Sequence, residues 1–191
     1  MPLTTPTAYF PPAHWASAGF TAGAWTVEAH ENYQRKGFRN RARIAGPNGP
    51  LWLTVPLTKG KNQRTPIGEV TIANEYDWRR EHEASIRTAY GRSPFYEHYA
   101  EAIFTILRLD HQYLLDLNNT LLTSVLALLN PPIGITESTE FIGADKTKHL
   151  PRLAPYPQVF TDRFGYQPGL SILDALFCLG PALPSHPTVA I

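Results

Sequence analysis

The chain has 191 residues, of which 43% are apolar and 12% are aromatic, and this is sufficient for one domain with its own hydrophobic core. Seventeen Lys and Arg residues are nearly balanced by sixteen Asp and Glu residues, which excludes the overall basic charge of a nucleic-acid-binding domain. The single cysteine, Cys178, excludes an intramolecular disulfide and a cysteine-rich zinc site.

The N-terminal region contains no targeting or membrane signal. Residues 1–7 carry no cationic segment and no long apolar run, and no later stretch approaches 18 consecutive apolar residues. We therefore expect a cytoplasmic protein that does not insert into a membrane.

The first predicted elements are a strand, a helix and a second strand. The apolar residues 7–10, which include Tyr9, stop at a double proline and are predicted to form a strand. A helix over 13–21 and a strand over 24–29 follow.

Residues 41–45 and 51–55 are predicted to pair as a β-hairpin. The dipeptide Asn48-Gly49 lies between these two apolar runs, and both of its residues tolerate the positive φ angles that tight hairpin turns require. The polar run 59–65 is predicted to be a loop, and residues 70–73 a further strand.

The middle of the chain changes to helical periodicity. Apolar residues recur at helical spacing over 77–91, 93–109 and 111–129, with Asn74 as a candidate cap of the first helix and the double proline after Asn130 as the end of the third. Beyond it we expect a strand at 133–139, a loop at 142–156, a strand or extended segment at 157–164, and a last helix over 171–179. Ser171 and Asp174 have the spacing of a capping box in that helix.

These elements predict an α/β fold within a single domain, residues 1–191. Its sheet is expected to be mainly parallel and Rossmann-like, formed by Tyr9 and by residues 25–29, 51–55 and 133–136, with a β-hairpin and the three-helix segment packed beside it. An α+β arrangement with a separate helical layer is the alternative.

A local cluster of cations is the strongest chemical feature of the sequence. Residues 35–43 contain five Lys and Arg residues and no acid, although the net charge of the whole chain is only +1. Guanidinium groups suit phosphate or carboxylate, so Lys36, Arg39 and Arg41 are predicted to bind an anion, with Asn32 and Asn40 supplying neutral hydrogen bonds. The alternative is a solvated charged bend.

His30 and Glu31 are the best candidates for acid–base catalysis. A histidine beside a carboxylate and near arginines can titrate close to neutral pH, although strand neighbours point to opposite faces, so a structural role remains open. Tyr33 lies among polar residues and is a candidate for stacking on a sugar or base.

The residues Tyr9 and Phe10 lead into a proline turn and a helix N-terminus, where phosphate could bind. The run from Phe10 to His14 is loosely similar to the Phe-x-Pro-x-His loop of nucleotidylyltransferases, but the second histidine of that loop is absent. A purely structural turn is the alternative. No P-loop, Gly-x-Gly-x-x-Gly, nucleophile-elbow or metal-ligand spacing occurs, so no metal and no bound cofactor is expected.

Six short motifs in order resemble those of the WbqC-like family of bacterial proteins. Their residues are Tyr9-Phe10-Pro11-Pro12, Glu31-Asn32-Tyr33-Gln34-Arg35-Lys36, Arg39-Asn40-Arg41, Leu53-Thr54-Val55-Pro56, Tyr90 with Ser93-Pro94-Phe95-Tyr96, and Leu170-Ser171-Ile172-Leu173-Asp174 with Phe177 and Gly180-Pro181. The resemblance implies that the protein is associated with the gene loci of O-antigen and other surface polysaccharides. Ala8 and the His30-Glu31-Asn32 triplet stand where many members have glutamine and an aspartate pair.

From this setting and the basic cluster we expect a transferase-like enzyme that binds a small phosphate-bearing molecule, such as a nucleotide or nucleotide-sugar. Acyl, aminoacyl and nucleotidyl transfer remain open as reactions. The alternative is a non-catalytic binding or assembly protein that uses its basic patch to recruit an acidic partner. No specific nucleic acid is expected as a partner, and the oligomeric state stays open.

Overall fold

A computed structural model describes residues 2–58, 64–129, 133–143 and 147–189. Its sheet has three strands: β1 (Leu3–Pro6), β2 (Ala24–Glu28) and β5 (Gly134–Glu137). They lie in the order β1-β2-β5, and both pairings are parallel. The helix α1 (Ala13–Ala22) connects β1 to β2, and it ends at Gly23, whose φ of 72° is a left-handed conformation that glycine adopts without steric cost.

The β-hairpin consists of β3 (Arg41–Ile44) and β4 (Leu51–Thr54), which pair antiparallel with Arg41 opposite Thr54 and Ile44 opposite Leu51. Alternate residues of β3, Ala42 and Ile44, are fully buried, as a strand with one face on the core requires. The predicted hairpin is confirmed, with Gly49 at a φ of 105° in its turn.

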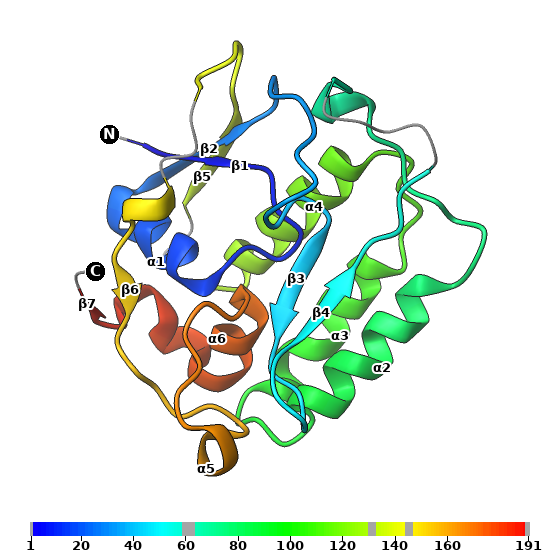
Figure 1. Ribbon diagram of the computed structural model, residues 1–191. Helices are drawn as coiled ribbons and strands as arrows, with labels where there is room; N and C mark the ends of the chain where they lie inside the picture. The colour runs from blue at the N-terminus through cyan, green and yellow to red at the C-terminus, as the bar shows by residue number, and fades with distance from the viewer. Residues whose placement is uncertain (1, 59–63, 130–132, 144–146, 190–191) are drawn as a thin grey trace.

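The three predicted central helices are present as α2 (Trp78–Tyr90), α3 (Tyr96–Leu107) and α4 (Leu114–Ala127). Each buries an apolar stripe. The cap of α2 is Asp77, whose carboxylate accepts from the backbone N–H of Arg80, and not Asn74 as the sequence suggested. Figure 1 shows the parallel sheet on one side of the molecule and α2 on the other, with the hairpin and α6 between them.

The C-terminal part wraps back over the start of the chain. It contains a 3-10 turn at Thr147–His149, the strand β6 (Arg152–Leu153) paired antiparallel with β7 (Thr188–Val189), the short helix α5 (Thr161–Phe164), the helix α6 (Ile172–Leu179) and a 3-10 segment at Gly180–Ser185. A further 3-10 turn lies at Ile67–Glu69. Residues 172–176 of α6 are entirely buried, so this helix belongs to the core.

Several predicted elements differ from the structure. The first strand is residues 3–6, and Tyr9 and Phe10 lie after it in the core, because a proline-bounded turn and their aromatic rings favour burial over strand pairing. Residues 70–73 make only isolated bridges, because Ile72 and Thr71 pair with different segments. Residues 51–55 belong to the hairpin and not to the parallel sheet, and residues 157–164 end in α5.

The expected capping box in α6 is also absent. No side chain caps this helix, and the carboxylate of Asp174 instead accepts from Tyr156 and Gln158. The predicted loop at 59–65 and the double-proline stop fall largely outside the described residues. The structure combines helices with a small parallel sheet and is therefore roughly of the predicted α/β class. Three parallel strands with separate antiparallel pairs do not establish the predicted Rossmann-like sheet.

Candidate functional site

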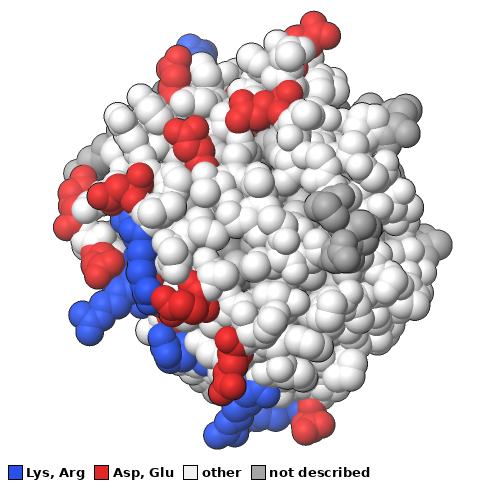
Figure 2. All heavy atoms as spheres, turned by 180° about the vertical axis from the view of Figure 1, so that it is seen from behind, with Lys and Arg blue, Asp and Glu red and all other residues white. Residues whose placement is uncertain are grey.

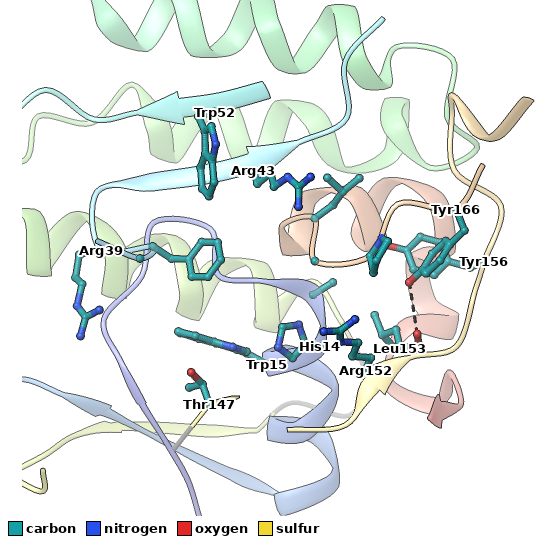
Figure 3. A pocket seen from close by; sticks show the side chains of 16 residues that line it. His14, Trp15, Arg39, Arg43, Trp52, Thr147, Arg152, Leu153, Tyr156 and Tyr166 are labelled. Carbon is teal, nitrogen blue, oxygen red and sulfur yellow. Dashed lines mark hydrogen bonds between the residues drawn. The ribbon is translucent and has the colours of Figure 1, made fainter. Parts of the chain in front are cut away.

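The large cavity has a volume of about 630 Å³ and lies between α1, the hairpin and the C-terminal segment. Figure 3 shows the hairpin contributing Arg43 and Trp52 from one side, while α1 and β6 contribute Trp15 and Arg152 from the other. Its lining therefore brings together segments that are more than a hundred residues apart in the chain.

Backbone hydrogen bonds hold these segments in place. The N–H of Ser171 donates to the carbonyl of Arg43 at 2.7 Å, and the N–H of Ile172 donates to the carbonyl of Pro11 at 2.7 Å. The start of α6 is thus joined both to the hairpin and to the turn before α1. A cavity wall built from such joined segments is largely preformed.

The electrostatics of the large cavity favour an anion. Arg39, Arg43, Arg152 and His14 line it, and none of its described lining residues is an Asp or Glu. The charge of Arg39 is compensated by Glu31, so the positive charge available in the cavity is that of Arg43 and Arg152. The guanidinium groups of Arg43 and Arg152 make no hydrogen bond or ion pair with the described part of the chain. These donors are therefore available to a ligand.

The pKa of His14 is lowered from 6.5 to about 4, mainly by burial and additionally by the neighbouring charge of Arg152. His14 stands in the first turn of α1, which has Pro12 as its N-cap and no acidic residue in that turn. The positive end of the helix dipole is thus not compensated locally by a carboxylate.

Aromatic rings form a wall of the large cavity. Trp15 packs edge-on against Phe38 with ring centroids 5.9 Å apart, and Phe38 lies 5.8 Å from Trp52. The guanidinium of Arg41 lies over the Trp52 ring at 4.5 Å. Such a wall offers flat apolar surfaces to a base or sugar ring.

Two tyrosines line the C-terminal end of the large cavity. The hydroxyl of Tyr156 donates to Asp174 at 2.7 Å, and that of Tyr166 donates to the carbonyl of Leu153 at 3.4 Å. Asp174 is fully buried, and burial raises its pKa. The Gln158 side chain also donates to this carboxylate, at 2.9 Å, so Tyr156 is held by a buried polar network.

The predicted anion-binding cations separate into different environments. Arg39 forms a bidentate pair with Glu31, with Nε–Oε1 at 2.9 Å and Nη2–Oε2 at 2.6 Å. Arg41 donates from Nε to the carbonyl of Gly37 at 2.8 Å and stacks on Trp52. Lys36 is exposed. Of these three cations, only Arg39 lines the large cavity, and Figure 3 shows it at the edge, away from Arg43.

The aromatic and amide candidates are mostly buried. Tyr9 and Phe10 are in the core, and the hydroxyl of Tyr9 bonds Nδ1 of His82 at 2.8 Å. Tyr33 is also buried, and its hydroxyl donates to Oδ1 of Asn40 at 3.2 Å. The amide of Asn40 in turn donates to the carbonyl of Val55 at 2.9 Å.

A second hollow of about 420 Å³ brings four of the predicted residues together. His30, Glu31, Asn32 and Arg39 line it, with Gln34, Phe141 and Gly143. Arg39 lines both hollows, so its pair with Glu31 lies between them. Both carboxylate oxygens of Glu31 accept from Arg39, so proton transfer by Glu31 requires this pair to open. The catalytic assignment of His30 and Glu31 stays a prediction.

Sequence reasoning did not identify most residues of the large cavity. Arg43 was recognised within the basic cluster but not assigned to the site. Arg152 and Tyr156 fall in the predicted loop at 142–156, and Tyr166 lies between the predicted segment 157–164 and the last helix, where no spacing marks them as partners of the hairpin. Other polar and charged residues, among them His149 and Arg163, stand in the same stretch, so the sequence offered no signal that sets Arg152 and the two tyrosines apart.

Two further features of the described residues bear on the class of the site. Within the described residues, no three His, Cys, Asp or Glu side chains gather in a way that could hold a metal ion. None of the helices in the described ranges combines the length and apolar character needed to cross a lipid bilayer.

Comparison with known proteins places the chain among relatives without a defined reaction. The family described as the WbqC-like protein family matches residues 7–154. The uncharacterized protein Rv1507c of Mycobacterium tuberculosis is 24% identical over 192 aligned residues, which cover 81% of this chain and 83% of that protein. No solved structure matches the chain.

Proposed function

The chain belongs to the WbqC-like protein family, and from this premise we propose that it is a transferase-like enzyme of surface-polysaccharide (O-antigen) biosynthesis. Its large cavity binds a phosphate-bearing ligand, a nucleotide or nucleotide-sugar. The reaction is transfer of an acyl, aminoacyl or nucleotidyl group involving that activated molecule.

One observation carries the proposal: the large cavity presents unpaired guanidinium groups beside a wall of aromatic rings. Arg43 and Arg152 approach from the hairpin and from β6, and two such groups suit the oxygens of a diphosphate. The exposed ring of Trp52 and the half-buried ring of Phe38 supply the flat apolar surface that a base or sugar requires, with the buried Trp15 packed against Phe38. The volume of about 630 Å³ is in the range of small-molecule sites.

The test is calorimetric titration of the protein with uridine diphosphate, together with crystals soaked in a nucleotide-sugar. Arg43→Ala and Arg152→Ala are each expected to weaken binding at least about tenfold, roughly 1.4 kcal/mol. Arg92→Ala is the matched control, because Arg92 is exposed and does not line the cavity. The proposal fails if uridine and adenosine diphosphates do not bind, or if soaked ligand lies away from Arg43 and Arg152.

A second function is recruitment of an acidic protein partner. It is favoured by Arg35 and Lys36, which are exposed and whose side chains make no hydrogen bond or ion pair with the described residues. The face seen in Figure 2 is less suitable, since its Lys and Arg side chains lie beside Asp and Glu side chains. Under this alternative, Lys36→Ala weakens a pull-down interaction strongly and leaves the surface-polysaccharide product unchanged.

A further inference from the structure

The second hollow differs in chemistry from the large cavity. Its cation, Arg39, is neutralised by the two carboxylate oxygens of Glu31 at 2.9 and 2.6 Å. The side chains of this pair are only 10% and 11% exposed, so the pair forms a fixed and nearly neutral base for the hollow. The other polar lining groups are the imidazole of His30 and the amides of Asn32 and Gln34. A hollow of this composition favours an uncharged polar ligand over an anion.

One aromatic side chain lines this hollow and is largely exposed. Phe141 is 63% exposed, and its neighbour Ile142 is 42% exposed. The two side chains place apolar surface beside the polar lining of the hollow. An exposed aromatic face is also the usual platform for the apolar face of a ring-shaped ligand.

A buried carboxylate joins the two walls of the second hollow. Glu28 is 4% exposed. It accepts from the backbone N–H of His30 at 2.8 Å, the hydroxyl of Ser138 at 2.9 Å and the backbone N–H of Ile142 at 2.7 Å. The chain on either side of the hollow, next to His30 and next to Phe141, is therefore fixed by the same side chain.

The pKa of Glu28 agrees with this role. Burial by itself raises this pKa, but the hydrogen bonds from Ile142, His30 and Ser138 outweigh burial, so that the pKa lies below its usual value. The carboxylate is ionised at neutral pH, and hydrogen bonds to an ionised acceptor are the stronger kind. The wall that carries Phe141 is thus anchored under the conditions in which a ligand would bind.

We propose that the second hollow binds an uncharged, hydroxylated sugar ring, with Phe141 against the apolar face of the ring and Asn32, Gln34 and His30 on its hydroxyl groups. Sugar binding is inferred from the lining of this hollow alone and does not require the proposed function. Arg39 then separates the sugar from the phosphate-bearing ligand of the large cavity, because it lines both hollows.

The test is titration of the ¹⁵N-labelled protein with the methyl glycosides of glucose and of N-acetylglucosamine, followed by NMR. We expect the side-chain amides of Asn32 and Gln34 and the backbone amide of Gly143 to shift in a saturable way. Phe141→Ala is expected to weaken binding at least tenfold, and Phe141→Tyr to retain it. Tyr76→Ala is the control, because Tyr76 is 52% exposed and lines neither hollow.

The double variant Arg43→Ala/Arg152→Ala separates this proposal from the proposed function. It should lose uridine diphosphate and still bind the methyl glycosides. Loss of glycoside binding in that variant would place the sugar in the large cavity and overturn the inference, as would unshifted amides or an unchanged affinity of Phe141→Ala. Glycoside binding at the hollow in a protein that binds no nucleotide would leave the inference standing and refute the proposed function.

Discussion

The buried pair of Arg39 and Glu31 separates the two hollows, and its removal should be costly. Both side chains are about nine-tenths buried, and two short hydrogen bonds join them. Removing one partner leaves the other charge buried without compensation, which typically costs about 3–5 kcal/mol. We therefore expect Glu31→Gln and Arg39→Gln each to lower the free energy of unfolding by about 3 kcal/mol or more.

The assay is a double-mutant cycle measured by urea unfolding. The double variant should be less destabilised than the sum of the single variants, with a coupling energy of about 1–3 kcal/mol, because neither charge then remains alone in the interior. Arg108 and Glu101 supply the control cycle. Their side chains are 49% and 76% exposed at a distance of 3.0 Å, and such exposed pairs contribute at most about 1 kcal/mol.

A coupling energy for Arg39 and Glu31 no larger than that of the control pair would refute this reasoning. It would mean that the pair is solvated in solution and does not form a rigid separation between the hollows. The same measurement bears on the catalytic prediction for Glu31. A strongly coupled carboxylate is held by Arg39, whereas a weakly coupled one is open to exchange a proton.

Three further predictions concern stability. Burial lowers the pKa of His82 from 6.5 to about 4, so the unfolded chain takes up a proton at this residue that the folded chain does not. Of the fall in the free energy of unfolding between pH 7 and pH 4, His82 should therefore contribute about 3 kcal/mol, and this contribution should be missing in His82→Gln. Gly180→Ala should lower the melting temperature clearly, because at a φ of 52° the new Cβ lies 2.6 Å from the Phe95 ring, and the penalties for φ and for crowding sum to about 2–5 kcal/mol. Tyr156→Phe should cost about 1–3 kcal/mol in denaturant unfolding, because it removes a donor from the buried carboxylate of Asp174, and an unchanged midpoint would show that this hydrogen bond is not formed in solution.

The periodic elements could be predicted from the sequence because their causes are local. The helices α2, α3 and α4 follow from apolar residues at helical spacing, and the hairpin follows from Asn48-Gly49 between two apolar runs. The short C-terminal strands β6 and β7 could not be predicted in this way. Each has two residues, and only their pairing with one another makes them strands.

The hydrogen bonds between buried side chains could not be predicted from the sequence either. Ser171 and Asp174 have the spacing of a capping box. The carboxylate of Asp174 instead accepts hydrogen bonds from Tyr156 and Gln158, because the fold brings these donors to it, and no side chain caps the helix. A local sequence pattern indicates which hydrogen bonds a side chain can form. Groups from distant parts of the chain compete for the same side chain, and this competition determines which hydrogen bonds are present in the fold.

The candidate site shows the same division. The family resemblance, the central helices, the hairpin and the concentrated positive charge at residues 35–43 could all be recognised from the order of the amino acids. The pairing of Arg39 with Glu31, the stacking of Arg41 on Trp52 and the position of Arg43 in the large cavity with Arg152 depend on how the chain folds. Charge and periodicity are properties of neighbouring residues, whereas a guanidinium group is available to a ligand only if no other group in the folded chain has already neutralised or covered it.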